Sequence, residues 1–201
     1  TDEFLDLMAN EPKLAPYLDV PLQHLDTDTL KRMNRPSKDV NTVKLVERIR
    51  ARIPRIALRT TMIVGFPGET RIGHLNMLHG MCELRFNWLG AFQYSIEDGT
   101  PAGTMPAQLS NATKQRRWKA VMEAQTEITA EWNRKRVGTR ARVLIESFDA
   151  ESGMFSGRSA SEAPEIDGTI YVTVETPVSI GSFVDAEITG ADAYDLHGRV
   201  I

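Results

Sequence analysis

Residues 57–70, ALRTTMIVGFPGET, join a strand-like run directly to a turn that contains two glycines and a proline. The run is rich in β-branched side chains, which favour strands, and it leads straight to Gly65 and Gly68. Glycine tolerates backbone conformations closed to other residues, and it lets a ligand approach the main chain with no Cβ in the way. A simpler alternative is a tight turn into a helix that begins at Glu69, whose charge suits a helix N-terminus.

The segments around this junction alternate between strand and helix patterns. Asp26 is placed to cap a helix, because its carboxylate can accept free N–H groups of the first turn, and Pro36 and Pro54 are helix stops. This order predicts parallel strands joined by crossover helices, with ligands bound at the carboxyl ends of the strands. We expect strands at 17–22, 57–64 and 88–95, and helices after Asp26, over 40–52 and over 70–84.

The second half of the chain has a different pattern. Residues 113–136 keep a helical spacing of apolar side chains, and Gly138 suits the end of that helix. Five short alternating strands separated by Gly, Pro and Asp turns follow, as in a small antiparallel barrel. The predicted fold class is therefore α/β plus all-β. The predicted domains are an α/β part over 1–100, a linker and connecting helix over 101–137, and a barrel over 138–201.

Charge is distributed unevenly between these parts. Residues 138–201 hold four basic and eleven acidic side chains, a net charge of −7, whereas residues 1–137 carry +4. Affinity for phosphates comes mainly from Lys and Arg, so a basic protein suits the barrel better than RNA does. An acidic solubilising surface without a partner is the alternative. In the helix before the barrel, we interpret the basic residues as a solvated face: Lys114, Arg116, Arg117 and Lys119.

Cysteine and histidine content limits the chemistry available to the chain. Cys82 is the only cysteine, so no disulfide can form within the chain, which favours a reducing, cytoplasmic setting. No apolar run reaches membrane-spanning length and no signal-peptide pattern is present, so we expect no membrane. The histidines show no metal-ligand spacing and are interpreted as surface residues: His24, His74, His79 and His197.

Four motifs resemble consecutive signatures of the methylthiotransferase branch of the radical S-adenosylmethionine (SAM) enzymes: PYLDVPLQH, LKRMNRP, RTTMIVGFPGET and FQYSIEDGTPA. The resemblance covers nearly the whole chain. It implies the last half of a partial (β/α)6 radical-SAM barrel, followed by a small five-stranded, OB-like antiparallel barrel called the TRAM domain. Within this branch, PLQH, YSIEDGTPA and APEIDGTIYV are similar to the RimO group, which modifies a ribosomal protein.

The resemblance also shows what these residues lack. Enzymes of this branch bind one four-iron–four-sulfur cluster through a CxxxCxxC loop, and a second through an N-terminal domain. Such clusters need several cysteine thiolates, and Cys82 stands alone. The resemblance therefore implies two 4Fe-4S clusters in the full-length protein, with ligands absent from these 201 residues. We expect a carboxy-terminal fragment that has no catalytic residue and no metal ligand of its own.

The resemblance places S-adenosylmethionine beside the GFPGET loop. It implies that Gly65 and Gly68 let the backbone approach the cofactor, that Arg59 and Gln23 hold its carboxylate end, and that Tyr94 lies near its adenine. Structural alternatives exist for the last three: pairing of the arginine with a core carboxylate, satisfaction of a buried backbone group by the glutamine, and simple packing of the tyrosine. These five residues form the predicted cofactor site.

The implied function of the full-length protein is transfer of a methylthio group to the β-carbon of an aspartate in the twelfth small-subunit ribosomal protein. We expect this basic partner to bind through the acidic barrel, and no nucleic acid as the direct substrate. A MiaB-type tRNA methylthiotransferase is one alternative, which the acidic barrel disfavours. A non-catalytic binding module is the other.

Overall fold

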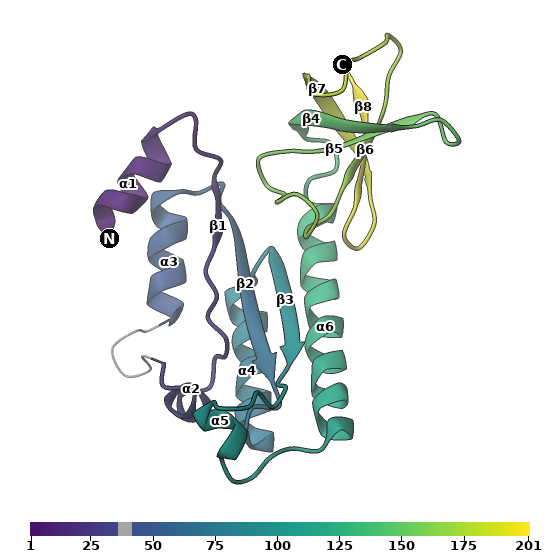
Figure 1. The fold of residues 1–201 in the computed structure, drawn as a ribbon. Coiled ribbons are helices and arrows are strands. Elements are labelled where there is room, and N and C mark those ends of the chain that lie inside the picture. The colour runs from purple at the N-terminus through teal and green to yellow at the C-terminus, as the bar shows by residue number, and fades with distance from the viewer. Residues whose placement is uncertain (36–41) are drawn as a thin grey trace. The chain divides into compact units, whose positions relative to one another are not determined.

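The computed structural model describes residues 1–35 and 42–201, and Figure 1 shows their path. The chain forms two compact units, which we call the barrel unit and the sheet unit. The barrel unit comprises Thr1–Tyr17, Arg55–Ala57 and Thr126–Ile201, and the sheet unit comprises Leu18–Pro54 and Leu58–Gln125. The domain boundaries expected from the sequence stay a prediction.

Three strands form the sheet, in the order β1 (Tyr17–Asp19), β2 (Ala57–Val64) and β3 (Trp88–Gln93). β2 and β3 are parallel, with Arg59 opposite Trp88. The first strand is shorter than expected, because Pro21 has no N–H to donate to a ladder. Pairing resumes beyond it at Gln23, which forms a parallel bridge with Met62. The parallel sheet predicted from the alternating pattern is confirmed.

Six helices are described: α1 (Asp2–Asn10), α2 (Thr27–Arg32), α3 (Thr42–Arg52), α4 (Arg71–Leu84), α5 (Pro101–Thr104) and α6 (Asn111–Arg134). Asp26 caps α2 as expected, since its carboxylate accepts the Thr29 N–H at 3.0 Å. Thr70 caps α4 in the same way, accepting from Gly73 at 2.9 Å. The expected stop at Pro36 and the expected helix start at Val40 lie outside the described residues.

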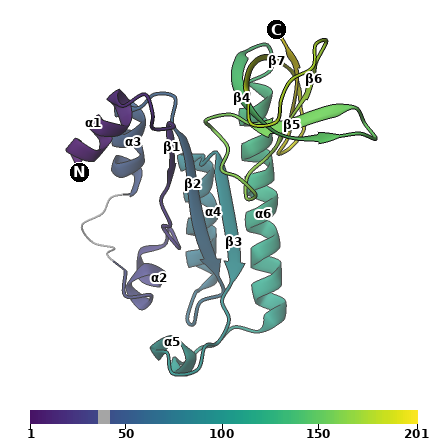
Figure 2. The ribbon, with the colours of Figure 1, turned by 45° about the horizontal axis from the view of Figure 1, so that its top comes forward.

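Burial alternates along β2 and separates its two faces. Leu58, Thr60, Met62 and Val64 are buried, whereas the residues between them are half-buried. α4 lies behind the sheet in Figures 1 and 2 and contributes fully buried methionines to the core of the sheet unit. The half-buried face of β2 carries Arg59, which belongs to the predicted cofactor site.

Five strands close into a barrel in the order β4 (Arg140–Asp149), β5 (Met154–Arg158), β6 (Ile170–Thr173), β8 (Leu196–Val200) and β7 (Phe183–Ala191). The five-stranded barrel is confirmed, but the expectation of an entirely antiparallel one is wrong. β6 and β8 pair in parallel, while the other four pairings are antiparallel. A closed ring with an odd number of strands cannot alternate direction all the way round, so one parallel pairing is unavoidable.

Candidate functional site

The loop after β2 turns through two glycines in the left-handed conformation. Gly65 has φ +75° and Gly68 has φ +78°, values that favour glycine. Within the loop, the Glu69 N–H donates to the Phe66 carbonyl at 2.9 Å, and the Gly68 N–H donates to the Ala107 carbonyl at 2.9 Å. The GFPGET segment is therefore a compact, internally bonded turn that leads directly into α4.

A basic side chain of the protein itself lies close to each of these glycines, Lys114 at Gly65 and Arg32 at Gly68. A Cβ built on Gly65 would collide with the Cγ of Lys114, and one built on Gly68 would lie 2.8 Å from a guanidinium nitrogen of Arg32. The left-handed turn favours glycine at both positions, and at Gly65 the close approach of the buried Lys114 stem adds a second reason, whereas the exposed end of Arg32 beside Gly68 could move aside. The space expected for a ligand above Gly65 is partly filled by the aliphatic stem of Lys114.

Gln23 lies at the carboxyl end of the sheet in an unusual backbone conformation. Its φ is 72°, which is uncommon outside glycine. Its N–H donates to Thr61 and its carbonyl accepts from Ile63, at 2.8 and 2.7 Å. These bonds hold the backbone against β2, and the half-buried side-chain amide makes no hydrogen bond within the described residues. A left-handed non-glycine residue held this way is a feature that binding sites often show.

Arg59 is engaged by an acidic side chain of the sheet unit. Its Nη1 lies 2.8 Å from Oδ2 of Asp19 and 3.4 Å from Oγ1 of Thr61. Pairing with a carboxylate is therefore present, as the structural alternative for this residue foresaw, although Asp19 is 39% exposed in its side chain and does not belong to the core. A ligand carboxylate that bound Arg59 would have to displace or share Asp19.

Tyr94 follows β3 and closes the same end of the sheet. Its N–H donates to Val64 at 2.8 Å, and its carbonyl accepts from the Lys114 ammonium at 2.8 Å. Its ring meets Phe66 edge to face, with centroids 5.2 Å apart. The phenolic oxygen is buried and has no hydrogen-bond partner within the described part of the chain, which leaves it available to a polar ligand.

A buried polar cluster lies directly behind this loop, and the sequence did not predict it. Glu69, which is 3% exposed, accepts a hydrogen bond from the Gly65 N–H. Its Oε1 lies 3.0 Å from Nη1 of Arg117, 3.6 Å from Nδ1 of His74 and 3.8 Å from Nε2 of His24. We call these four residues the Glu69 cluster. It gathers the loop, α4, α6 and the segment after β1 around one carboxylate.

The environment of Glu69 favours its charged form. Burial alone would raise the pKa of this carboxyl, but the His24 ring, the Arg117 guanidinium and the Gly65 N–H together hold the pKa below its usual value. The pKa of His74 is also lowered, first by burial and then by Arg117, against the opposing pull of Glu69. The cluster therefore holds an ionised carboxylate beside a neutral His74.

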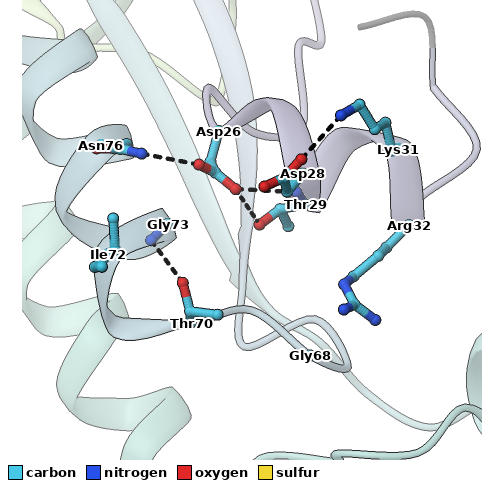
Figure 3. A pocket seen from close by; sticks show the side chains of 10 residues that line it. All are labelled: Asp26, Asp28, Thr29, Lys31, Arg32, Gly68, Thr70, Ile72, Gly73 and Asn76. Carbon is cyan, nitrogen blue, oxygen red and sulfur yellow. Dashed lines mark hydrogen bonds and ion pairs between the residues drawn. The ribbon is translucent and has the colours of Figure 1, made fainter.

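A cavity of about 500 Å³ lies beside the loop, between α2 and the start of α4. Figure 3 shows that Asp26 links its two walls, since the carboxylate accepts from Asn76 and from Thr29, each at 2.9 Å. On the far side, Arg32 extends toward Gly68. The cavity borders the GFPGET turn but includes none of the Glu69 cluster; its lining is Asp26, Asp28, Thr29, Lys31, Arg32, Gly68, Thr70, Ile72, Gly73 and Asn76.

Several sequence interpretations near the site were wrong. His24 and His74 are buried at 0% and 9% exposure and are not surface residues. Of the four basic residues expected on a solvated face of α6, Arg116 and Lys119 are exposed, but Lys114 is 5% exposed and the Arg117 side chain 11%, so these two turn inward. One signal was available: both residues share helical spacing with Trp118 and Val121, which points them to the same packed side. Spacing alone could not show that this side meets the loop.

The fold places this chain in a class of proteins in which a parallel α/β segment is followed by a five-stranded OB-type barrel. Residues 137–201 match the family model described as the TRAM domain. Over its whole length, the chain is similar to ribosomal protein uS12 methylthiotransferases RimO. It is 43% identical over 202 residues to the Geobacter sulfurreducens protein and 41% identical over 201 residues to the Desulforamulus reducens protein. The predicted resemblance to the RimO group is confirmed.

These similarities cover part of each relative. The whole chain aligns with the Geobacter and Desulforamulus proteins but spans 45% of their length. A Rhodopseudomonas palustris relative is 43% identical over 99% of this chain and 44% of its own length. Within the described residues, no helix is long and apolar enough to cross a membrane. No group of three or more His, Cys, Asp or Glu side chains among residues 1–35 and 42–201 is placed to hold a metal ion.

Proposed function

We propose that this chain is the cofactor-facing and partner-binding part of a radical SAM methylthiotransferase that modifies ribosomal protein uS12 in the cytoplasm. The observation that carries the proposal is similarity along the whole chain to proteins named for that activity, at 43% identity. The parallel strands support it, because ligands of such sheets bind where the GFPGET loop lies. The residue modified would be an aspartate, at its β-carbon.

The residues at the loop fit S-adenosylmethionine in part. Gln23 and Tyr94 each offer a polar group without a hydrogen-bond partner among the described residues, at the carboxyl end of the sheet. Gly65 and Gly68 hold the loop in the turn that brings its backbone to that edge. Arg59 would reach a ligand carboxylate by displacing Asp19 or by sharing its guanidinium with it. The proposed site therefore consists of Gln23, Gly65, Gly68 and Tyr94, together with Arg59, which pairs with Asp19 here and would pair with the carboxylate of a bound ligand.

The iron–sulfur clusters of such an enzyme would be held elsewhere in the protein. A 4Fe-4S cluster takes several cysteine thiolates, and this sequence contains one cysteine, Cys82, which is exposed on α4. When bound, the clusters and S-adenosylmethionine would supply the radical chemistry and the sulfur. The role left to these residues is to bind and orient the cofactor and to present the substrate protein.

The barrel is the proposed contact for uS12. Its net charge of −7 suits a lysine- and arginine-rich protein and opposes phosphates. Several of its carboxylates are already paired on the barrel surface, as Glu146 is with Arg158 at 2.8 Å. Others, including Glu151 and Glu175, are exposed and form no ion pair with any residue that the structure describes. Those carboxylates would provide the attractive field.

The decisive experiment uses the intact, reconstituted protein with S-adenosylmethionine and a reductant. Mass spectrometry of uS12 should show a methylthio group on one aspartate, and a tRNA anticodon stem-loop treated in parallel should stay unmodified. Modification of the RNA alone would replace this proposal with a tRNA methylthiotransferase. No modification of either substrate, together with no affinity for S-adenosylhomocysteine, would leave the non-catalytic binding module.

A further inference from the structure

The Glu69 carboxylate connects the loop to a helix that the sequence suggested was only a connector. One oxygen of Glu69 accepts the Gly65 N–H, and the other lies 3.0 Å from Nη1 of Arg117 on α6. The same nitrogen of Arg117 donates to the Glu69 backbone carbonyl at 3.0 Å. Arg117 therefore holds both the side chain and the main chain of the residue that closes the turn.

Lys114 adds a second attachment from the same helix. Its stem packs over Gly65, and its ammonium donates to the Tyr94 carbonyl at 2.8 Å, so it spans the ends of β2 and β3. Two further bonds from α6 reach β3 and the residues before it. Trp118 donates to the Ala91 carbonyl and Gln125 to the Phe86 carbonyl, each at 2.8 Å. The first half of α6 is thus hydrogen-bonded along the length of β3, from Tyr94 just after the strand to Phe86 just before it.

The cost of burying these charges argues that they do more than fill space. An ionised carboxylate removed from water is costly unless it is paired and hydrogen-bonded, and an apolar replacement of equal volume is often neutral or stabilising. The groups that face Glu69 are His24 from the segment after β1, His74 from α4 and Arg117 from α6. Three separate segments of the sheet unit therefore each contribute one of them.

We propose that Glu69 is a positioning residue, which Arg117 orients so that its carboxylate pins Gly65 in the left-handed turn of the ligand-binding loop. α6 thereby becomes part of the cofactor site without touching the cofactor. The inference rests on the proposed function for the identity of the ligand, but the pinned turn itself does not depend on any ligand. The Gly65 amide reports directly on it.

The first test measures hydrogen–deuterium exchange at single amides of the intact protein without ligand. Glu69→Gln should speed exchange at Gly65 by roughly tenfold or more, the loss expected for one charge-assisted hydrogen bond. The Gly68 amide, which bonds to Ala107, should keep its rate and serves as the internal control. Glu123→Gln on the exposed side of α6, where Glu123 pairs with Lys119, makes the same charge change and should alter neither amide.

Arg117→Lys is the milder second variant, in case Glu69→Gln does not fold. It keeps a positive charge beside Glu69 but loses the planar guanidinium, so exchange at Gly65 should rise by about threefold. Equal acceleration at Gly65 and Gly68 would mean general loosening and would overturn the proposal. Unchanged exchange at Gly65 in both variants would overturn it as well.

A second readout connects the turn to the ligand. Calorimetry with S-adenosylhomocysteine should show affinity about tenfold weaker for Glu69→Gln than for the wild type and Glu123→Gln, through loss of the ordered loop. If the wild type binds no S-adenosylhomocysteine, the proposed function fails. The exchange rates still test whether Glu69 holds the Gly65 turn, because they are measured without a ligand. If the wild type binds and Glu69→Gln binds equally well, the positioning role is overturned.

Discussion

The barrel core consists of seven apolar side chains, each at most 1% exposed, whereas the loop after β2 encloses a carboxylate, an arginine and two histidines. In the barrel, strands alternate an inward apolar residue with an outward polar one, and burial alone accounts for the packing. Around Glu69, removing charged groups from water costs free energy, and ion pairs and hydrogen bonds to specific partners must offset that cost. The two regions therefore differ in what a substitution removes: contact area in one and charge compensation in the other.

The difference indicates that the barrel core contributes mainly to folding stability, whereas the loop after β2 uses buried charges to fix a backbone conformation. A small barrel gains stability from every apolar side chain it encloses. A loop held by an ion pair gains a defined backbone conformation instead, because the acceptor, the donor and the charge partner must all be in place. The following substitutions test this contrast, beginning with the largest expected effect.

Ile145→Ala should produce the largest loss of stability. Ile145 is 0% exposed in the barrel core, so its truncation leaves a cavity and should lower the free energy of unfolding by roughly 3–4 kcal/mol. Urea unfolding of the intact protein, followed by the NMR signals of the barrel amides, measures this loss. The control, Ile180→Ala at a 63% exposed side chain, should change stability by less than about 0.5 kcal/mol. Similar losses for both would contradict the assignment of the core.

Arg117→Met should have the next largest effect, through charge and not through volume. It leaves Glu69 buried without its arginine, and should cost roughly 2–3 kcal/mol, below the full penalty because the Gly65 N–H still donates to the carboxylate. Fluorescence of Trp88 and Trp118, both in the sheet unit, follows the unfolding in a Trp132→Phe background, because Trp132 lies in the barrel unit. Lys119→Met, at a 71% exposed position of the same helix, is the matched control. If Arg117→Met left the free energy of unfolding unchanged, the cluster would need no charge compensation.

Acidification should weaken the sheet unit before it weakens the barrel. The folded-state pKa of His74 is lowered, so its contribution to stability is complete above its usual pKa of about 6.5 and is lost as the pH falls from there through the lowered pKa. Glu69 acts in the same direction at lower pH, because its pKa is lowered from its ordinary value of 4.5. Between pH 7.5 and 5.5, tryptophan-detected stability should therefore decrease. His74→Gln should flatten this slope, and His79→Gln at the exposed neighbour should not.

Charge reversal on the barrel surface should leave stability almost unchanged and alter association instead. Glu151→Lys with Glu175→Lys changes exposed carboxylates, for which effects within about 0.5 kcal/mol are usual. The association rate with uS12 should fall, and its decrease with added salt should become shallower, since screening acts on the field of the barrel. Stopped-flow fluorescence over a salt series measures both. Unchanged rates would place the contact for uS12 outside the barrel.

Local sequence patterns predicted most of the secondary structure. The β2 strand and the cap at Asp26 follow from side-chain type at each position, and five barrel strands follow from alternation between turns. α5 was missed because its four residues, Pro101–Thr104, are too few to show helical periodicity. Cys82 belongs to a residue type that is often buried, yet it is exposed, because it lies on the outer side of α4 while Met77 and Met81 face inward.

The candidate site was predictable only in part. Gly65 and Gly68 stand out in the sequence because glycines at a strand end signal an unusual backbone, and both have positive φ. Glu69 directly follows them, yet nothing local shows whether its carboxylate faces water or the interior. His74 is only five residues away, but the other two partners of Glu69 are separated from it by 45 residues at His24 and 48 at Arg117, distances along the chain over which no periodic pattern extends.

The sequence by itself determined the class of this chain: its order of strands and helices, the turn at GFPGET, the acidic barrel and the resemblance to uS12 methylthiotransferases. Only the tertiary structure decided that β6 and β8 run parallel, that Arg59 pairs with Asp19, and that Arg117 and the two histidines meet at Glu69. The physical reason is the separation along the chain over which each kind of interaction acts. Propensity, capping and turn chemistry act within a few residues, whereas ring closure and charge compensation depend on which distant segments pack together.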